Sequence, residues 1–452
     1  MGITADVRIK KHSNIMFILF ITFVILFSFL IPLPVIASCA IAALGFAIGL
    51  LIISFVESEE DRKFLLRVFI YSYLARILVT LILYVLTLGW RSHDGFFIDD
   101  GWCYSENGWM MAKYLAKRLN VNIFLIKRMT VSGTFSIYDQ INARVYLLVG
   151  KSPLSMLFMN SAIGAITVIF MYLISILVFK KEVARMAAMV CAFWPSLFLW
   201  STQNLKEPAT VFLSVLCFWG FISFLKKANL MYLVVVLIGT YLLINLMPPI
   251  AVILIMSIAL HAAVSVYKLV KRTPILILVI CVASIPILIK LTDVVSGVLN
   301  QYGSFKFTIS DMLTSLNFHR NPRASANLAI LPGYDFKGVG SLAIYLPIGL
   351  LAVLFGPFPW QLFSPSQIFA APEMLIWYFM VPYLIKGLRV SFKNNLRYLF
   401  SMFLFIAGVI LMLSLVEGNI GTIFRHRAVA LNFLLLFVVV GINAGKKKLS
   451  YE

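Results

Sequence analysis

The chain has 452 residues, of which 62% are hydrophobic and 12% are charged, and its mean hydropathy is +0.97. Soluble domains carry roughly 45–50% apolar and about 25% charged residues, so this composition excludes a soluble globular protein. The formal net charge of +20 could suggest a nucleic-acid partner, but the lysines and arginines lie mostly in short clusters between apolar segments. The positive-inside rule explains that pattern, and we expect no nucleic-acid partner.

Long apolar runs predict membrane-spanning helices. Runs of about 18 or more apolar residues match the thickness of a bilayer, and they indicate helices rather than the alternating strands of a β-barrel. The candidate spans, about twelve in number, lie near residues 14–32, 35–56, 64–88, 153–179, 183–200, 208–225, 229–246, 249–267, 273–291, 373–390, 397–416 and 427–444. The first run lacks a small-residue cleavage site, so we expect a retained helix rather than a signal peptide. The predicted fold class is an all-α polytopic membrane protein.

Basic clusters in the short loops predict the orientation of these spans. They all fall on one side: Arg62/Lys63, Lys180/Lys181/Arg185, Lys226/Lys227, Lys268/Lys271/Arg272, Lys386/Arg389/Lys393/Arg397 and Lys446/Lys447/Lys448. By the positive-inside rule this side is cytoplasmic, and both termini lie there. We expect a multi-pass protein of a bacterial inner membrane whose active face is extracytoplasmic.

The apolar run 340–355 decides this topology, because the pattern holds only if the run does not cross the membrane. Pro357 and Pro359 break any helix that follows it, and Trp360 suits a membrane interface. We interpret the run as a re-entrant or interfacial helix. The alternative, a true span, would place the basic cluster of residues 386–397 outside.

Two long segments, residues 89–150 and 292–372, remain on the extracytoplasmic side in this topology. No internal repeat is visible, so residues 1–452 are expected to form a single membrane domain. Both outer segments are predicted to carry interfacial helices, and they are where chemistry is expected.

Adjacent carboxylates mark the first outer segment. The chain has only 18 acidic residues, and Asp94, Asp99 and Asp100 form their densest group. Tyr104 and the apolar residues after it recur at helical spacing, which predicts a helix lying on the membrane surface. An aspartate at a helix start can simply cap the helix or complement its dipole. Two adjacent aspartates at a membrane surface also suit proton abstraction, and both interpretations remain open.

The Asp99-Asp100 pair, followed by Tyr104 in the first large outer loop, resembles the acidic motif of the membrane glycosyltransferases of the C superfamily. That group includes protein O-mannosyltransferases and lipid A aminoarabinose transferases. The resemblance implies a fold of about eleven to thirteen spans, a polyprenyl-phosphate-linked sugar donor and a catalytic loop carboxylate. By its spacing to the tyrosine, Asp100 corresponds to the family's catalytic aspartate and Asp99 to its neighbour.

Three further segments resemble uncharacterised bacterial members of the same superfamily. They are Trp194 to Pro208 (WPSLFLWSTQNLKEP), Gly356 to Trp360 (GPFPW) with Pro372-Glu373, and Asn419 to Arg427 (NIGTIFRHR). Together with the first loop, the resemblance reaches most of the chain in patches. It implies function in cell-surface polysaccharide or glycoconjugate synthesis.

Cations at the outer ends of predicted helices are candidates for binding a lipid phosphate. Arg425, His426 and Arg427 break the positive-inside pattern, and arginine binds phosphate with a planar fork of donors. They could equally snorkel to lipid headgroups. Lys206 could also hold phosphate while Glu207 orients the loop, although the two could form only an exposed ion pair.

A metal site is not required by the sequence. His93 and Asp94, together with Asp99 and Asp100, could hold a divalent cation such as Mg²⁺ or Mn²⁺ through oxygen ligands. No cofactor-binding fingerprint is present. Elsewhere, Arg76 lies at a costly position inside a predicted span, and His261 is expected to be a helix-packing residue.

The predicted activity is transfer of a sugar, with inversion, from a polyprenyl phosphate to the hydroxyl of a saccharide, lipid or protein acceptor. Asp100, helped by Asp99, would accept the acceptor proton, and the cations would stabilise the leaving phosphate. One alternative is an O-antigen-type polymerase or ligase, for which Arg320 and Arg323 would matter more. A second alternative is a flippase or transporter of lipid-linked sugars.

Overall fold

Helices make up nearly all the regular structure in the computed structural model. The model describes residues 33–90, 95–116, 136–270, 309–324, 329–361 and 370–446. Within these ranges the extended structure is a single isolated bridge between Ala329 and Asn419. Seven helices in this part of the chain are long and apolar enough to cross a membrane, or up to eight if one bent pair forms a span. The predicted all-α, multi-pass membrane class is therefore confirmed.

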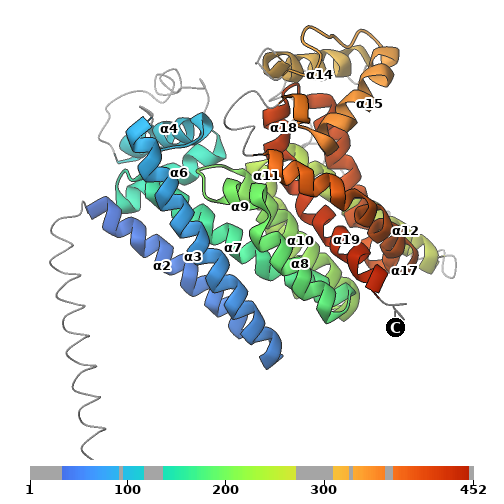
Figure 1. Cartoon of the computed structure of the whole chain (residues 1–452), viewed down its shortest axis with the longest axis horizontal. Helices are drawn as coiled ribbons and strands as arrows, with labels where there is room; N and C mark the ends of the chain where they lie inside the picture. Colours follow the sequence, from blue (N-terminus) through green and yellow to red (C-terminus); the bar gives the residue numbers. More distant parts are fainter. Residues whose placement is uncertain are drawn as a thin grey trace, which may run out of the picture. The chain divides into compact units, whose positions relative to one another are not determined.

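The helices follow one another along the chain as labelled in Figure 1. They are α2 (Leu33–Ser54), α3 (Glu59–Trp90), α4 (Asp99–Leu115), α6 (Ile137–Val149), α7 (Pro153–Val178), α8 (Lys181–Phe193), α9 (Pro195–Ser201), α10 (Glu207–Lys227), α11 (Met231–Leu246), α12 (Pro248–Val270), α14 (Ile309–Ala324), α15 (Val339–Phe355), α17 (Ala371–Val416), α18 (Ile420–His426) and α19 (Ala428–Lys446). A short 3-10 helix covers Pro359–Gln361.

The chain divides into two compact units, where a single domain was expected. Unit 1 comprises residues 1–55, 75–162 and 202–205, and unit 2 comprises residues 56–74, 163–201 and 206–452. Of the site residues predicted from the sequence, the aspartates belong to unit 1 and the phosphate-binding cations to unit 2.

In unit 1, the helices α4 and α6 pack closely against each other. Helix α6 begins with a capping box, in which the Ser136 hydroxyl accepts from the backbone N–H of Asp139 at 3.1 Å and the Asp139 carboxylate accepts from that of Ser136 at 2.6 Å. Gly108 of α4 permits the contact, since a Cβ there would overlap the side chain of Asn142. Tyr138 and Tyr146 of α6 are buried.

In unit 2, helix α17 packs along the buried helix α19. Their backbones touch at Gly387 and Gly441, because a Cβ on either glycine would overlap backbone atoms of the other helix. Small residues permit such close approach, which increases van der Waals contact between helices in a bilayer. Phe433 of α19 also packs edge-on against Phe218 of α10 and Phe405 of α17.

Helix α17 has 46 residues and turns back on itself. Near its start, the Trp377 indole donates to the carbonyl of Leu354 in α15 at 2.7 Å. Near its end, the backbone of Ser414 lies against Gly349 of the same α15. Trp377 and Ser414 would be about 55 Å apart in a straight helix, so α17 must bend sharply between them. The two predicted spans 373–390 and 397–416 are thus two halves of one helical segment.

Other predicted spans differ from the observed helices. The predicted span 183–200 is the pair α8 and α9, bent by 56°, because Pro195 cannot continue α8. The predicted span 229–246 is α11, which has only 16 residues. The predicted spans 14–32 and 273–291 lie outside the described residues.

The prediction that His261 is a helix-packing residue is confirmed. Its imidazole is buried and bonds the Ser401 hydroxyl at 3.1 Å and the carbonyl of Arg397 at 3.0 Å. The ring also packs against Phe221. It therefore joins α12 to the second half of α17. Arg76 is buried in α3 at 1% exposure.

We expect Gly441→Ala to destabilise the protein by about 1–3 kcal/mol, because the added methyl group must push α19 away from α17. Gly340→Ala is the matched control, since nothing lies within 4 Å of a Cβ at that position. Thermal unfolding in detergent should show a lower midpoint for Gly441→Ala alone. Equal midpoints would contradict the close backbone contact.

Candidate functional site

Asp99 and Asp100 occupy the first turn of α4. The N-cap residue is Ile98, whose side chain makes no capping hydrogen bond. Neither aspartate is therefore the N-cap, although carboxylates in the first turn still complement the helix dipole. The side chain of Asp99 is exposed and that of Asp100 is half-buried. Both carboxylates are thus accessible at the end of a helix that is otherwise packed against α6.

A buried amide fixes the start of α4. The Asn204 side chain donates to the carbonyl of Gly101 at 2.9 Å and to the side-chain oxygen of Asn142 in α6 at 3.0 Å. Asn204 is fully buried. Because Gly101 directly follows Asp100, this bond holds the backbone that carries the two carboxylates.

A second amide holds the segment that carries Asn204. The Asn160 side chain of α7 donates to the carbonyls of Gln203 and Leu205 at 2.6 and 2.8 Å. It also reaches the Tyr138 hydroxyl at 2.9 Å. Buried polar groups of this kind are expensive unless bonded. The sequence analysis did not single out Asn142 or Asn160 as supporting residues. For Asn160, the signal available in the sequence was an amide side chain inside the apolar run 153–179.

The surroundings of the aspartates are partly aromatic. Tyr104 packs edge-on against Tyr138 with ring centroids 5.0 Å apart. Burial raises the pKa of the Cys103 thiol, and the charges of Asp100 and Asp99 raise it further. Cys103 is therefore held as a neutral thiol, which disfavours a role as a nucleophile.

The predicted metal ligands cannot be assembled from the described residues. His93 and Asp94 lie outside them. Within the described ranges, no group of three or more His, Cys, Asp or Glu side chains could hold a metal ion. Asp99 and Asp100 could still hold Mg²⁺ together with water or a substrate phosphate, because Mg²⁺ commonly takes only one or two carboxylates from the protein; the divalent cation stays a prediction.

In unit 2, the Glu207 carboxylate contacts two of the predicted phosphate-binding residues, Arg425 and His426. Its carboxylate Oε1 lies 3.0 Å from Arg425 Nε and 3.1 Å from His426 Nε2. The other ring nitrogen of His426, Nδ1, lies 2.8 Å from the Glu417 carboxylate. Glu207, Glu417 and His426 are each buried. Of the two interpretations left open for Lys206 and Glu207, the exposed ion pair does not fit the structure: Glu207 is buried and pairs with Arg425 and His426, because the fold brings α18 to the start of α10.

The contacts of the His426 imidazole favour its charged form. Burial alone would lower its pKa, but the contacts with Glu207 and Glu417 outweigh burial and raise the pKa above the usual 6.5. A charged histidine with both N–H groups directed at carboxylates is a rigid bridge between them.

Arg427 takes part in a network that joins three segments of the chain. They are residues 194–208, residues 356–360 with 372–373, and residues 419–427, the segments that resemble bacterial members of the glycosyltransferase superfamily. Its guanidinium donates to the carbonyl of Gly356 at 2.9 Å and lies 3.4 Å from the Glu373 carboxylate. Glu373 in turn accepts from the backbone N–H of Ser196 at 2.6 Å and from its hydroxyl at 2.8 Å. The end of α18, the loop after α15 and the starts of α9 and α17 therefore meet in one buried network.

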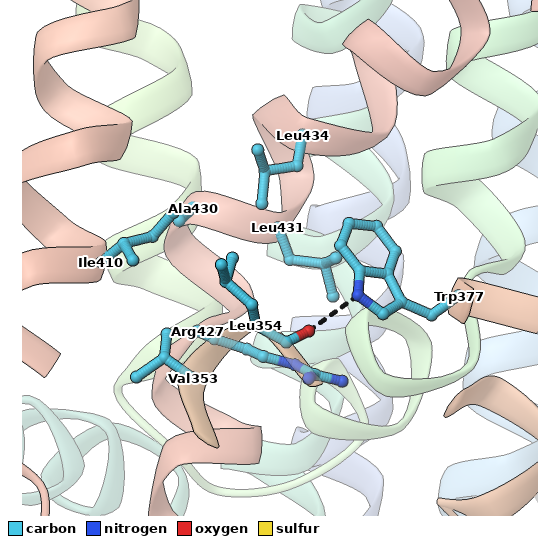
Figure 2. Close-up of a pocket in the computed structure, with 8 residues that line it drawn as sticks. All are labelled: Val353, Leu354, Trp377, Ile410, Arg427, Ala430, Leu431 and Leu434. Carbon is cyan, nitrogen blue, oxygen red and sulfur yellow. Dashed lines mark hydrogen bonds between the residues drawn. The ribbon is translucent and has the colours of Figure 1, made fainter. Parts of the chain in front are cut away.

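A small cavity lies beside Arg427 in this network. Figure 2 shows eight of the residues that line it, with Trp377 bonded to Leu354 and with Leu431 and Leu434 above the Arg427 guanidinium. Its volume of about 10 Å³ corresponds to roughly one water molecule. Arg427 contacts Gly356 and Glu373 and is enclosed by tightly packed side chains. Its role in the structure is therefore to hold these segments together. Its predicted contact with a substrate phosphate stays a prediction.

Lys206 adds a further positive charge beside this cluster, and that charge acts on the neighbouring Glu207. It is half-buried at the start of α10, next to Glu207. Within the described part of the chain it makes no ion pair with a carboxylate. An ammonium in this position can attract an anion, and its predicted contact with a phosphate stays a prediction.

Arg320, one of the two arginines named for the polymerase alternative, is fully buried; the side chain of the other, Arg323, lies outside the described residues. The Arg320 guanidinium donates to the carbonyls of Tyr334, Ile330 and Leu331 and lies over the ring of Tyr345, 4.5 Å from the centroid. These contacts hold α14 and the turn at residues 330–334 against α15. The residue is therefore committed to structure and is not available to a substrate here.

The fold and these clusters define the class of the protein as a multi-pass α-helical membrane protein with acidic and mixed-charge sites on separate units. Comparison with known protein families and with characterised proteins finds no match for the chain.

We expect Asn204→Ala to loosen the start of α4, because it leaves the Gly101 carbonyl and the Asn142 side-chain oxygen without this buried donor, at a cost of about 1–3 kcal/mol. Hydrogen exchange in residues 98–104 should become faster while exchange in α19 stays unchanged. Asn245→Ala is the control, since Asn245 is exposed. Unchanged exchange in Asn204→Ala would show that the amide does not hold this turn.

The stabilisation contributed by His426 should depend on pH. Because its folded pKa is raised above the unfolded value of about 6.5, the contribution is fully present below that value and is lost as pH rises through the folded pKa. The difference in unfolding midpoint between wild type and His426→Gln should shrink as pH increases above 6.5. Glu417→Gln removes one carboxylate partner, so it should move this loss to lower pH. A pH-independent difference would contradict a charged imidazole.

Proposed function

We propose that the protein is an inverting glycosyltransferase that transfers a sugar from a polyprenyl phosphate to an acceptor hydroxyl on the extracytoplasmic face of a bacterial inner membrane. The observation that carries the proposal is the pair Asp99 and Asp100, accessible in the first turn of α4 and held by the buried Asn204 amide. The resemblance of this motif to the acidic motif of C-superfamily glycosyltransferases supports it.

In the proposed reaction Asp100 is the general base. Its carboxylate removes the proton of the acceptor hydroxyl as the oxygen forms a bond to the anomeric carbon. The bond from that carbon to the phosphate oxygen breaks on the opposite face, and its electron pair leaves with the polyprenyl phosphate. Asp99, one residue earlier, adds negative charge that favours the proton transfer.

The leaving phosphate requires positive charge, and the candidates named from the sequence include Lys206, Arg425 and His426. Lys206 is suited to bind the phosphate because its ammonium forms no ion pair with a carboxylate within the described residues. Arg425 and His426, in contrast, both pair with Glu207. In this proposal Lys206 contacts the phosphate directly. Arg425 and His426 add positive charge from a fixed framework, the arrangement that stabilises charge developing in a transition state.

The remaining details of the proposed topology come from the sequence. About twelve spans, cytoplasmic termini and a re-entrant or interfacial α15 are part of this proposal. At 17 residues, α15 is about 25 Å long, shorter than the roughly 30 Å core of a bilayer.

We expect Asp100→Asn to lower the rate of sugar transfer by about a hundred- to ten-thousand-fold without unfolding the protein, because the amide cannot accept the proton. Purified protein in lipid nanodiscs would be incubated with radiolabelled polyprenyl-phosphate sugars and a membrane extract as the source of acceptors. Asp335→Asn is the matched control, an exposed carboxylate on the second outer segment.

The same assay decides between the alternatives. Donor consumption that depends on Asp100 supports the transferase. If the wild-type protein consumes no monosaccharide donor but consumes a pyrophosphate-linked oligosaccharide, the protein is a polymerase or ligase. Movement of lipid-linked sugar across vesicles without acceptor would indicate a transporter.

A further inference from the structure

A second cavity lies between α4 and α6 in unit 1. Its volume is about 200 Å³, and Trp109, Lys113, Tyr146 and Leu147 are among the residues that line it. The space that one water needs on the same measure is about 10–15 Å³, so a small headgroup fits. Trp109 and Lys113 lie about 14 and 20 Å along the helix axis from Asp100, so the cavity is separate from the two aspartates.

The charge at this cavity is positive and uncompensated. The Lys113 ammonium lies 5.4 Å from the centre of the Trp109 ring, within the range of a cation–π contact. It forms no ion pair with a carboxylate among the described residues. Glu106, one helical turn before Trp109, pairs with Lys151 instead. The cavity therefore favours a ligand that brings negative charge.

The wall of the cavity is rigid and partly aromatic. Tyr146 is 1% exposed, and its hydroxyl bonds that of Ser105 at 2.7 Å. Trp109 packs edge-on against the Tyr146 ring, with centroids 6.4 Å apart. Tryptophan and tyrosine with one polar end are the side chains that membrane interfaces favour.

Apolar side chains surround the cavity. Leu115, Leu147 and Leu148 are 47%, 44% and 85% exposed, and they lie on the same two helices. A soluble anion gains nothing from such leucines, whereas acyl chains bury them. Charge inside the cavity and apolar surface beside it together match an amphiphile.

We propose that this cavity binds the anionic headgroup of a bilayer lipid. Its phosphate would pair with Lys113, the glycerol part would lie against Trp109, and the acyl chains would cover Leu147 and Leu148. The site anchors the α4–α6 pair at the membrane surface. It does not depend on sugar transfer, so it stands or falls separately from the proposed function.

Native mass spectrometry of the delipidated full-length protein tests the proposal. We expect phosphatidylglycerol to bind at least about tenfold more tightly to wild type than to Lys113→Gln, a difference worth about 1.4 kcal/mol. Lys113→Arg should keep most of the affinity, because it keeps the charge. Lys337→Gln, which removes an exposed lysine from the second outer segment, should bind like wild type.

Two outcomes would overturn the proposal. One is equal binding of phosphatidylglycerol by wild type and Lys113→Gln, both with unchanged thermal unfolding. The other is displacement of the lipid by inorganic phosphate at equal concentration, because the cavity would then be a simple anion site. Phosphatidylcholine, whose headgroup has no net charge, should bind wild type and Lys113→Gln alike; a Lys113-dependent affinity equal to that of phosphatidylglycerol would overturn the requirement for net charge.

Discussion

Lipid cannot supply hydrogen bonds, and this constraint shapes both units. Inside a bilayer each backbone and side-chain polar group must find its partner within the protein. The helices satisfy the backbone, and buried amides satisfy the places where helices end. Asn160 and Asn204 illustrate the second device, because together they bond three carbonyls of non-helical or terminal residues.

The same constraint explains the pairing of charges in unit 2. Glu207, Glu373 and Glu417 are buried, and each lies within reach of an arginine or a histidine from the segment 425–427. A buried charge without a partner would cost several kcal/mol. The network therefore fixes which helix ends meet, and it makes this corner of unit 2 sensitive to the loss of any one member.

Against this background, cations without a carboxylate partner are informative. Among the residues considered for binding, Arg320, Arg425 and Arg427 are committed to carbonyls or carboxylates. Lys206 and Lys113 are not, within the described part of the chain. Lysine is a compact charge on a flexible stem, so it can reach a ligand that arrives later. The three arginines therefore stabilise the fold. In our proposals Lys206 binds a substrate and Lys113 binds a lipid.

The sequence by itself determined the class of the protein, because apolar runs of bilayer length have no other stable solution than spanning helices. It also located the start of α4 at Asp99 and indicated that His261 packs between helices, since both depend on local spacing. Only the tertiary structure decided that Arg427 ties Gly356 to Glu373, that Asn204 holds Gly101, and that α17 turns back against α15. These contacts join residues far apart in the chain, and one sequence carries no signal for which distant helix ends will meet.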